Sequence, residues 1–332
     1  MQQVAVIGTT TWGTTLAMHL GRQDVSCTLI ARTREESEKL ESDRQNTRFL
    51  KNHRFPDKLR VTHATPESIQ NSEIILIAVP SQRFRENVRL IKKDILNHQI
   101  VLIATKGLEM NSGKRMSEII SEELPSNISK LTCVLSGPNL AMEIISGKPS
   151  SSVIASADLL AAGKAQTLLN SPLFRVYTNT DIVGVELGGA LKNIIAIGSG
   201  IVDGLEYGAN TKASFITRGL AEITRLGTAA GANPLTFSGL AGLGDLLATT
   251  SSPLSRNRFV GLELAKGNPA KTILSNMSNV AEGVYTTSAT LKIAEQLKVD
   301  MPITRAIYRI LFENMDLNQA IRELMERPPG SE

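Results

Sequence analysis

The first half of the chain alternates short apolar runs with amphipathic stretches. The runs predict strands at Val4–Ile7, Ser26–Ala31, Ile74–Val79, Ile100–Thr105, Thr132–Leu135, Val153–Ala155 and Arg175–Tyr177. Most are almost continuously apolar, which is typical of parallel strands covered on both faces. Helical stretches such as Gly13–Arg22 and Met116–Leu124 lie between them. This order predicts an α/β, Rossmann-like domain with a doubly wound parallel sheet over residues 1–180.

The pattern changes after about residue 180, where helical periodicity dominates and strand-like runs nearly disappear. Helices are expected at Ile182–Val202, Ala213–Ala230, Arg258–Ala265, Thr286–Gln296, Ile303–Glu313 and Leu317–Met325. We therefore expect an all-α domain over residues 181–326, separated from the first domain by a cleft. Residues 327–332 are expected to form a disordered tail.

The composition is that of an ordinary globular protein, with 42% hydrophobic and 20% charged residues among 332. The net charge of +4 comes from Lys and Arg spread over both halves, whereas nucleic-acid-binding proteins gather these residues on one face. We therefore expect no nucleic-acid partner. A small anionic ligand accounts equally well for the excess of positive charge.

Cys27 and Cys133 each lie in an apolar run with no second Cys or His close by in the sequence. No metal site is expected from them, and buried free thiols indicate a reducing compartment. The N-terminus lacks the features of a signal peptide, and no run approaches about 18 uncharged apolar residues. We expect a cytoplasmic protein without a membrane span.

The first predicted strand runs into Gly8-Thr9-Thr10-Thr11-Trp12-Gly13 and then a helix. In a dinucleotide-binding turn the first Gly makes the bend, the middle one lets the backbone approach the pyrophosphate, and the third lets helix and strand pack. Thr10 replaces the middle glycine, and we expect it to weaken the grip on the cofactor. The helix that follows offers its free amides to phosphate.

The residue after the second strand tests which nicotinamide cofactor binds. NAD sites usually place an acid there for the ribose 2′-hydroxyl, whereas this chain places Arg32 there, with Arg34 close behind. Arginine suits a 2′-phosphate, so we expect NAD or NADP, with NADP at least tolerated. The alternative is that Arg32 is an ordinary solvated loop residue.

Lys192 is the only charged residue between Glu186 and Asp203, and its helical neighbours are small or apolar. We expect it to project into a cleft, where burial lowers the pKa of a lysine toward the range useful for proton transfer. The alternative is a lysine at a domain edge whose ammonium reaches solvent. Lys106 directly follows the strand Ile100–Thr105, so it lies at the carboxyl edge of the sheet, where ligands bind in α/β folds. The alternative is that Lys106 is an ordinary solvated loop lysine.

The four histidines, His19, His53, His63 and His98, all lie in the first domain, and none is expected at the carboxyl end of a strand. A His–acid pair or a Ser-His-Asp triad is therefore hard to assemble, which leaves lysine as the natural acid or base. Ser255-Arg256-Asn257 precedes a predicted helix and resembles a phosphate site at a helix N-terminus. Ser255 is also suited to a simple N-cap role.

Several segments resemble the bacterial-type NAD(P)-dependent glycerol-3-phosphate dehydrogenases. They are residues 104–109 (ATKGLE), 135–139 (LSGPN), 184–196 (GVELGGALKNIIA), 242–246 (GLGDL), 255–257 (SRN) and 280–283 (VAEG). The similarity, in this order and spacing, covers nearly the whole chain. It implies interconversion of sn-glycerol 3-phosphate and dihydroxyacetone phosphate, a supply of glycerol 3-phosphate for phospholipid synthesis, and a homodimer.

The resemblance also implies roles for individual residues. Lys192 is implied as proton donor and acceptor, and Lys106 is implied to contact both cofactor and substrate. The implied substrate residues are Lys106, Gly137, Asn139, Lys192, Asp245, Ser255, Arg256 and Asn257. The implied cofactor residues, including the turn glycines Gly8 and Gly13, are Gly8, Thr11, Trp12, Gly13, Arg32, Phe49, Lys106, Ala141, Arg256, Val280 and Glu282.

Three positions depart from the family pattern: Thr10, Asn139 where the family usually has Ser, and Thr33 where a basic residue often stands. All three concern the binding of cofactor or substrate, and none concerns Lys192. Two alternatives stay open, a nucleotide-binding regulatory protein that has lost catalysis and a related dehydrogenase acting on another small substrate.

Overall fold

The computed structural model describes residues 3–277 and 280–328 and divides into two compact units. The first unit comprises residues 1–106 and 114–186, and the second comprises residues 107–113 and 187–332. The division thus falls six residues beyond the expected boundary at 180, and a short segment of the first half belongs to the second unit. Of the expected tail, residues 329–332 lie outside the described residues, and Arg327 forms an ion pair of 2.5 Å with Asp300.

The first unit is built on a sheet in the order β3-β2-β1-β4-β5-β6-β7-β8. Its strands are β1 (Gln3–Ile7), β2 (Ser26–Ala31), β3 (Leu59–His63), β4 (Ile74–Ile77), β5 (Ile100–Ile103), β6 (Thr132–Ser136), β7 (Ser150–Ala155) and β8 (Phe174–Asn179). Neighbours pair in parallel except β6 and β7, which are antiparallel. The doubly wound order around β1 and β4 confirms the Rossmann-like fold class.

The strand β3 was not predicted. It lies at the edge of the sheet and alternates buried with exposed residues, as in Leu59, Arg60 and Val61, so it lacks the continuous apolar run of a central strand. His63 ends this strand, which corrects the expectation that no histidine lies at the end of a strand.

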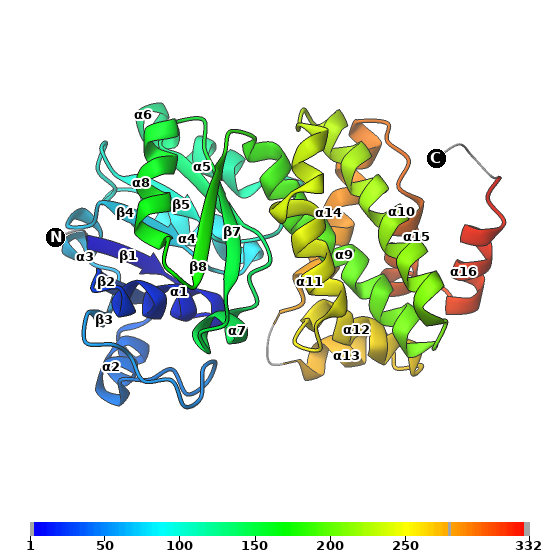
Figure 1. Cartoon of the computed structure of the whole chain (residues 1–332), viewed down its shortest axis with the longest axis horizontal. Coiled ribbons are helices and arrows are strands. Elements are labelled where there is room, and N and C mark those ends of the chain that lie inside the picture. Colours follow the sequence, from blue (N-terminus) through cyan, green and yellow to red (C-terminus); the bar gives the residue numbers. More distant parts are fainter. Residues whose placement is uncertain (1–2, 278–279, 329–332) are drawn as a thin grey trace. The chain divides into compact units, whose positions relative to one another are not determined.

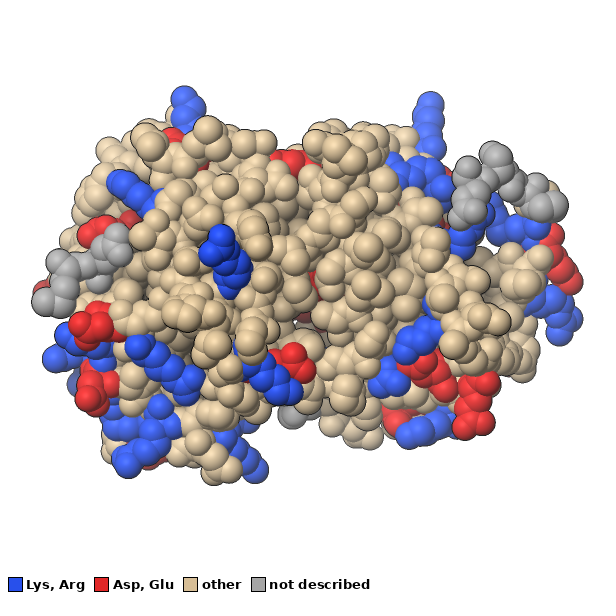
Figure 2. All heavy atoms as spheres, in the orientation of Figure 1, with Lys and Arg blue, Asp and Glu red and all other residues tan. Residues whose placement is uncertain are grey.

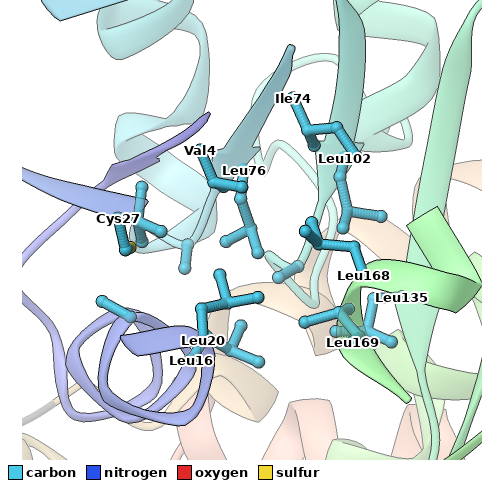
Figure 3. Close-up of a cluster of buried hydrophobic side chains, with 14 of the residues drawn as sticks. Val4, Leu16, Leu20, Cys27, Ile74, Leu76, Leu102, Leu135, Leu168 and Leu169 are labelled. Atoms are coloured by element: carbon cyan, nitrogen blue, oxygen red, sulfur yellow. The ribbon is translucent and has the colours of Figure 1, made fainter. Parts of the chain in front are cut away.

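The helices of the first unit cover both faces of its sheet (Figure 1). They are α1 (Thr11–Arg22), α2 (Arg34–Asp43), α3 (Pro66–Gln70), α4 (Phe84–Ile91), α5 (Met116–Glu123), α6 (Ser126–Ser129), α7 (Ala141–Ile145) and α8 (Leu159–Leu169), with a 3₁₀ turn at Ser81–Arg83. Figure 3 shows Leu16 and Leu20 of α1 beside Leu168 and Leu169 of α8, directed toward strand residues such as Leu76. Alternate strand residues point to the opposite face, where α5 and α6 pack.

The second unit is helical in its described residues. Its helices are α9 (Ile182–Gly204), α10 (Gly208–Ala229), α11 (Asp245–Ser251), α12 (Arg256–Ala265), α13 (Ala270–Asn276), α14 (Glu282–Gln296), α15 (Pro302–Phe312) and α16 (Leu317–Met325). A 3₁₀ turn at Pro234–Ser238 and a π-helical turn at Leu240–Gly244 precede α11. The helices α11 and α13 were not predicted, because each has only seven residues.

The helix α9 starts in the first unit and continues through the second. Among the described helices it alone is long and apolar enough to cross a membrane, yet 89% of its most apolar 18-residue window is buried within the protein. It packs closely on α12, because a Cβ added to Gly261 would lie 1.9 Å from the carbonyl oxygen of Ile197. These features are typical of a core helix.

The start of α9 is held in the first unit by Glu186. Its carboxylate accepts hydrogen bonds from the Arg115 guanidinium and the Ser117 backbone N–H, each at 2.8 Å. Burial raises the pKa of the Glu186 carboxyl, and Arg115 and Ser117 oppose that shift. These contacts at the start of α5 explain why the first unit extends to residue 186.

Candidate functional site

The turn between β1 and α1 has no room for a side chain at either of its outer glycines. Gly8 has φ +111°, and a Cβ there would lie 2.8 Å from the carbonyl oxygen of Ala78. A Cβ on Gly13 would lie 2.1 Å from the carbonyl oxygen of Gly8. The chain therefore bends tightly from β1 into α1, whose N-terminus carries Thr11 and Trp12 and faces the carboxyl edge of the sheet.

Thr10 has a role that its sequence position did not predict. It is the N-cap of α1, where its hydroxyl accepts a hydrogen bond from the Gly13 N–H at 3.0 Å and donates one to the Ala78 carbonyl at 2.8 Å. Its φ of −64° suits any L-residue. The hydroxyl thus holds the start of α1 and the residue after β4, a stabilising role that the comparison with the glycine motif did not include.

The end of β2 meets this turn through a residue that no motif indicated, Glu36. One carboxylate oxygen accepts a hydrogen bond from the Thr9 hydroxyl at 2.6 Å, and the other accepts one from the Arg32 backbone N–H at 3.2 Å. Thr9 follows β1 and Arg32 follows β2, and these strands are paired in parallel. Only this pairing brings Glu36 to the turn, so the sequence carried no local signal for it.

The two arginines after β2 differ in their surroundings. Arg34 forms an exposed ion pair of 2.8 Å with Glu38, whereas no described residue forms a hydrogen bond or ion pair with the exposed Arg32 guanidinium. Figure 2 shows acidic and basic side chains interleaved at the end of the first unit where α2 lies. Arg32 is therefore the basic side chain of this pair that remains for a ligand.

Phe49 lies in a loop that is tied to the same turn. The buried Asn46 donates hydrogen bonds to the Thr9 carbonyl and the Thr14 hydroxyl, both at 2.9 Å, and its own carbonyl accepts one from the Phe49 N–H at 3.2 Å. The Arg48 guanidinium lies over the Phe49 ring, 4.9 Å from its centroid. The turn, the end of β2 and this loop thus form one assembly. Ala141 begins α7, which packs against α1.

A second group lies after β5 and β6 of the same unit. The Lys106 ammonium donates a hydrogen bond to the Gly137 carbonyl at 2.7 Å. Asn139 donates to the Ser152 hydroxyl at 3.1 Å, and Ser152 donates to the Ser136 carbonyl at 2.7 Å. The buried Oδ1 of Asn139 has no hydrogen-bond partner among the described residues. This part of the site therefore offers one ammonium and one acceptor oxygen.

In the second unit, Lys192 is almost completely buried. Its ammonium donates hydrogen bonds to Asp245 Oδ1 at 2.5 Å and to the Thr249 hydroxyl at 2.6 Å. Lys192 is 7% exposed and Asp245 is 1% exposed. A buried ammonium is stable only with such a partner. Thr249 was not predicted, because it gains its role only from the one helical turn that separates it from Asp245.

Ser255, Arg256 and Asn257 lie at the start of α12. The buried Ser255 is its N-cap and accepts a hydrogen bond from the Arg258 N–H at 3.2 Å. The Asn257 amide donates to the Asn193 side chain at 2.9 Å, and its oxygen accepts from the Gly283 N–H at 3.0 Å. Asn257 thus joins α12 to α9, beside Lys192, and to the start of α14.

The remaining expected cofactor residues of the second unit lie near this junction. Glu282 is the first residue of α14, and the exposed Val280 precedes it by two positions. Although the Arg256 side chain is accessible to solvent, crowding by surrounding atoms lowers its pKa, and the Glu282 carboxylate opposes that shift. The described residues contain no group of three or more His, Cys, Asp or Glu side chains that would hold a metal ion.

Comparison with known families matches both halves of the chain. Residues 3–162 match the family model described as the NAD-dependent glycerol-3-phosphate dehydrogenase N-terminus, and residues 181–322 match that of its C-terminus.

Named relatives and a solved structure agree with this match. A glycerol-3-phosphate dehydrogenase [NAD(P)+] from Dehalococcoides mccartyi is 50% identical over 98% of this chain and 91% of its own length. The enzyme of the same name from Chlorobium phaeobacteroides is 44% identical over 99% of both chains. The crystal structure of glycerol-3-phosphate dehydrogenase from Coxiella burnetii superposes with a TM-score of 0.92 at 35% identity, covering 98% of this chain and 99% of that one.

Proposed function

Since the chain belongs to the NAD-dependent glycerol-3-phosphate dehydrogenase family, we propose that it interconverts sn-glycerol 3-phosphate and dihydroxyacetone phosphate. A bound nicotinamide cofactor, NAD or NADP, supplies or accepts the hydride. In the cell the reaction would supply glycerol 3-phosphate for phospholipid synthesis. The relatives that support this proposal have the same enzyme name, and they match this chain over nearly the full length of both chains.

The buried, hydrogen-bonded group of Lys192, Asp245 and Thr249 supports the proposed proton transfer. As hydride reaches the carbonyl carbon of dihydroxyacetone phosphate, its oxygen develops negative charge and needs a proton. We assign that proton to the Lys192 ammonium, which Asp245 and Thr249 hold in position. In the reverse direction, the neutral lysine takes the proton of the alcohol.

The first unit supplies groups suited to the cofactor. The outer glycines of the turn, Gly8 and Gly13, and the start of α1 fit a pyrophosphate. Lys106 and Asn139 are proposed as substrate residues of the same unit. The Asn139 Oδ1 atom, which has no partner among the described residues, suits a hydroxyl of glycerol 3-phosphate.

The start of α12 is proposed to hold the substrate phosphate. The first backbone amides of a helix have no intrahelical partner, and the helix dipole favours an anion there. The Arg256 guanidinium adds a charge-assisted hydrogen bond. Because both ends of the Asn257 side chain are already bonded to Asn193 and Gly283, we assign Asn257 a contact through its backbone N–H.

The assembly and the compartment are further parts of the proposal. We propose a homodimer, as the family resemblance implies, and analytical ultracentrifugation would test it. We propose a cytoplasmic location because Cys27 and Cys133 are both buried free thiols, which suit a reducing compartment.

One experiment tests the function directly. Nicotinamide absorbance is followed with dihydroxyacetone phosphate, once with NADH and once with NADPH. Oxidation of either cofactor that depends on the ketone supports the dehydrogenase. Binding of cofactor without turnover would instead support a regulatory protein that has lost catalysis, and turnover of other ketones alone would support a different substrate.

A further inference from the structure

The carboxylate of Glu36 spans the ends of two neighbouring strands. It accepts hydrogen bonds from the Thr9 hydroxyl (2.6 Å) and the Arg32 backbone N–H (3.2 Å). In dinucleotide-binding folds, an acid directly after the second strand usually binds the adenosine ribose hydroxyls. Position 32 is that place in this chain, and it carries arginine. Glu36 therefore brings a carboxylate, from the first turn of α2, to the place where the acid is missing.

A purely local role for Glu36 does not account for this geometry. Thr33 caps α2 and accepts a hydrogen bond from the Glu36 N–H at 3.2 Å, so the two residues match the pattern of a capping box. In that motif the acid would bind the N–H of Thr33 itself. Here the carboxylate instead binds Thr9 and Arg32, both of which precede the helix.

The bonded carboxylate still has acceptor capacity. An ionised carboxylate has about four lone-pair sites, and the two hydrogen bonds occupy one on each oxygen. The remaining sites suit the 2′- and 3′-hydroxyls of a ribose, which are donors. A 2′-phosphate offers only negative charge in this position, and like charges repel.

The Arg32 side chain has the opposite preference. No described residue pairs with its guanidinium, whereas Arg34 is engaged by Glu38 at 2.8 Å. Because arginine binds phosphate strongly and in a defined geometry, Arg32 favours NADP(H). An acid and a base with opposite preferences thus lie at the same strand end.

We propose that Glu36 is the specificity-determining residue that makes the site accept NAD(H), by binding the adenosine ribose hydroxyls and repelling a 2′-phosphate. Arg32 restores part of the binding of NADP(H). This inference rests on the proposed function, since it assumes a nicotinamide cofactor at the turn.

Direct titration of the full chain with NADH and with NADPH tests the inference without requiring turnover. Glu36→Gln keeps the size of the side chain and removes its charge. It should raise the Kd for NADH at least about tenfold relative to that for NADPH, because hydrogen bonds to a charged acceptor are among the stronger ones. Arg32→Gln should shift the ratio of the Kd for NADH to the Kd for NADPH in the opposite direction. Thr9→Val, which removes one donor that holds Glu36, should shift it in the same direction as Glu36→Gln, by a smaller factor.

Glu35→Gln is the matched control, since Glu35 is an exposed neighbour in the same helical turn and loses the same charge. It should change the ratio less than about threefold, and melting temperatures confirm that the variants are folded. The inference is wrong, and the proposed function stands, if both cofactors bind and Glu36→Gln changes the ratio of the two Kd values no more than Glu35→Gln does. If the wild type binds neither cofactor, the proposed function fails, and the inference fails with it.

Discussion

The Nζ atom of Lys192 lies 2.5 Å from the Oδ1 atom of Asp245, and both side chains are almost fully buried. Removing one partner of such a pair leaves an uncompensated buried charge, which typically costs about 3–5 kcal/mol. A test of catalysis at Lys192 must therefore separate the loss of the proton donor from the loss of the ion pair.

Lys192→Arg makes that separation. Arginine retains the positive charge beside Asp245, yet its very high pKa keeps the guanidinium protonated, so it does not exchange a proton near neutral pH. Because general acid catalysis is worth about 10²–10⁴-fold, kcat should fall by at least about 100-fold while the melting temperature changes little. Steady-state kinetics and thermal denaturation measure the two effects.

Lys192→Met is the companion variant. It should lose activity to a similar degree and also lose stability, because Asp245 then remains buried without its cation. An arginine variant with more than roughly a tenth of the wild-type kcat would remove Lys192 from its proposed role.

The cap on α1 predicts a stability effect at Thr10. Thr10→Ala removes the hydroxyl that binds the Gly13 N–H and the Ala78 carbonyl, and it should lower the free energy of unfolding by about 1 kcal/mol. Thr10→Ser should retain most of that stability. Urea denaturation measures both. Because a Cβ at position 10 is expected to weaken the grip on the pyrophosphate, Thr10→Gly should tighten NADH binding. Unchanged affinity would show that the threonine Cβ does not obstruct the cofactor.

Glu222 predicts a dependence of stability on pH. This buried residue of α10 accepts hydrogen bonds at the start of α15 from the Ile303 N–H (2.5 Å), the Thr304 N–H (3.2 Å) and the Thr304 hydroxyl (3.1 Å). Burial raises the pKa of its carboxyl from 4.5 to about 7, against the opposing effect of these bonds. The folded protein therefore favours the neutral carboxyl more strongly than the unfolded chain does.

Because the folded pKa lies above the unfolded one, this stabilisation is fully present below about pH 4.5 and is lost as the pH rises through about 7. The contribution that disappears across this window is about 3 kcal/mol. Glu222→Gln lacks the titration, so its free energy of unfolding should fall less than that of the wild type over the same range. If the free energies of unfolding of the two proteins changed in parallel with pH, a raised pKa of the Glu222 carboxyl would be ruled out.

The start of α12 predicts that the phosphate determines substrate choice. Dihydroxyacetone keeps the reacting carbonyl and lacks the phosphate, so its kcat/KM should be lower by at least about 10³-fold, if the charged contacts are worth several kcal/mol. Both kcat and KM should suffer, since binding energy from the phosphate also orients the carbonyl.

Arg256→Ala provides the matching test. It should reduce kcat/KM for dihydroxyacetone phosphate while leaving that for dihydroxyacetone nearly unchanged, which narrows the gap between the two ketones. If wild-type enzyme used dihydroxyacetone within roughly tenfold of its phosphate, the phosphate site at α12 would have to be abandoned.

The fold was largely predictable because both classes of element left periodic signals. The central strands are apolar throughout, and the long helices repeat with helical period. The edge strand β3 escaped because its residues, such as Arg60, alternate between buried and exposed. The boundary at Glu186 also escaped, because it depends on a tertiary contact with Arg115.

The site was predictable where a single residue stood out from its neighbours. Lys192 is conspicuous as a lone charge in an apolar helix, whereas Glu36 lies in a polar stretch where one more acid carries no signal. The functional geometry of Glu36 arises from the pairing of β1 with β2, and that of Thr249 from the helical turn after Asp245. Contacts of this kind depend on tertiary structure, and a motif of adjacent residues does not encode them.

The short segment 107–113 belongs to the second unit although the first unit continues after it. Lys292 donates hydrogen bonds to the carbonyls of Met110 and Asn111, at 3.2 and 3.4 Å. A ribosome that adds about 5–20 residues per second makes Lys292 roughly 10–40 s after Met110. During synthesis this segment therefore leaves the ribosome long before its partner exists. A first unit that folds during synthesis does so without the contacts that hold the segment in the second unit. The segment gains its contacts with the second unit only when α14 has emerged.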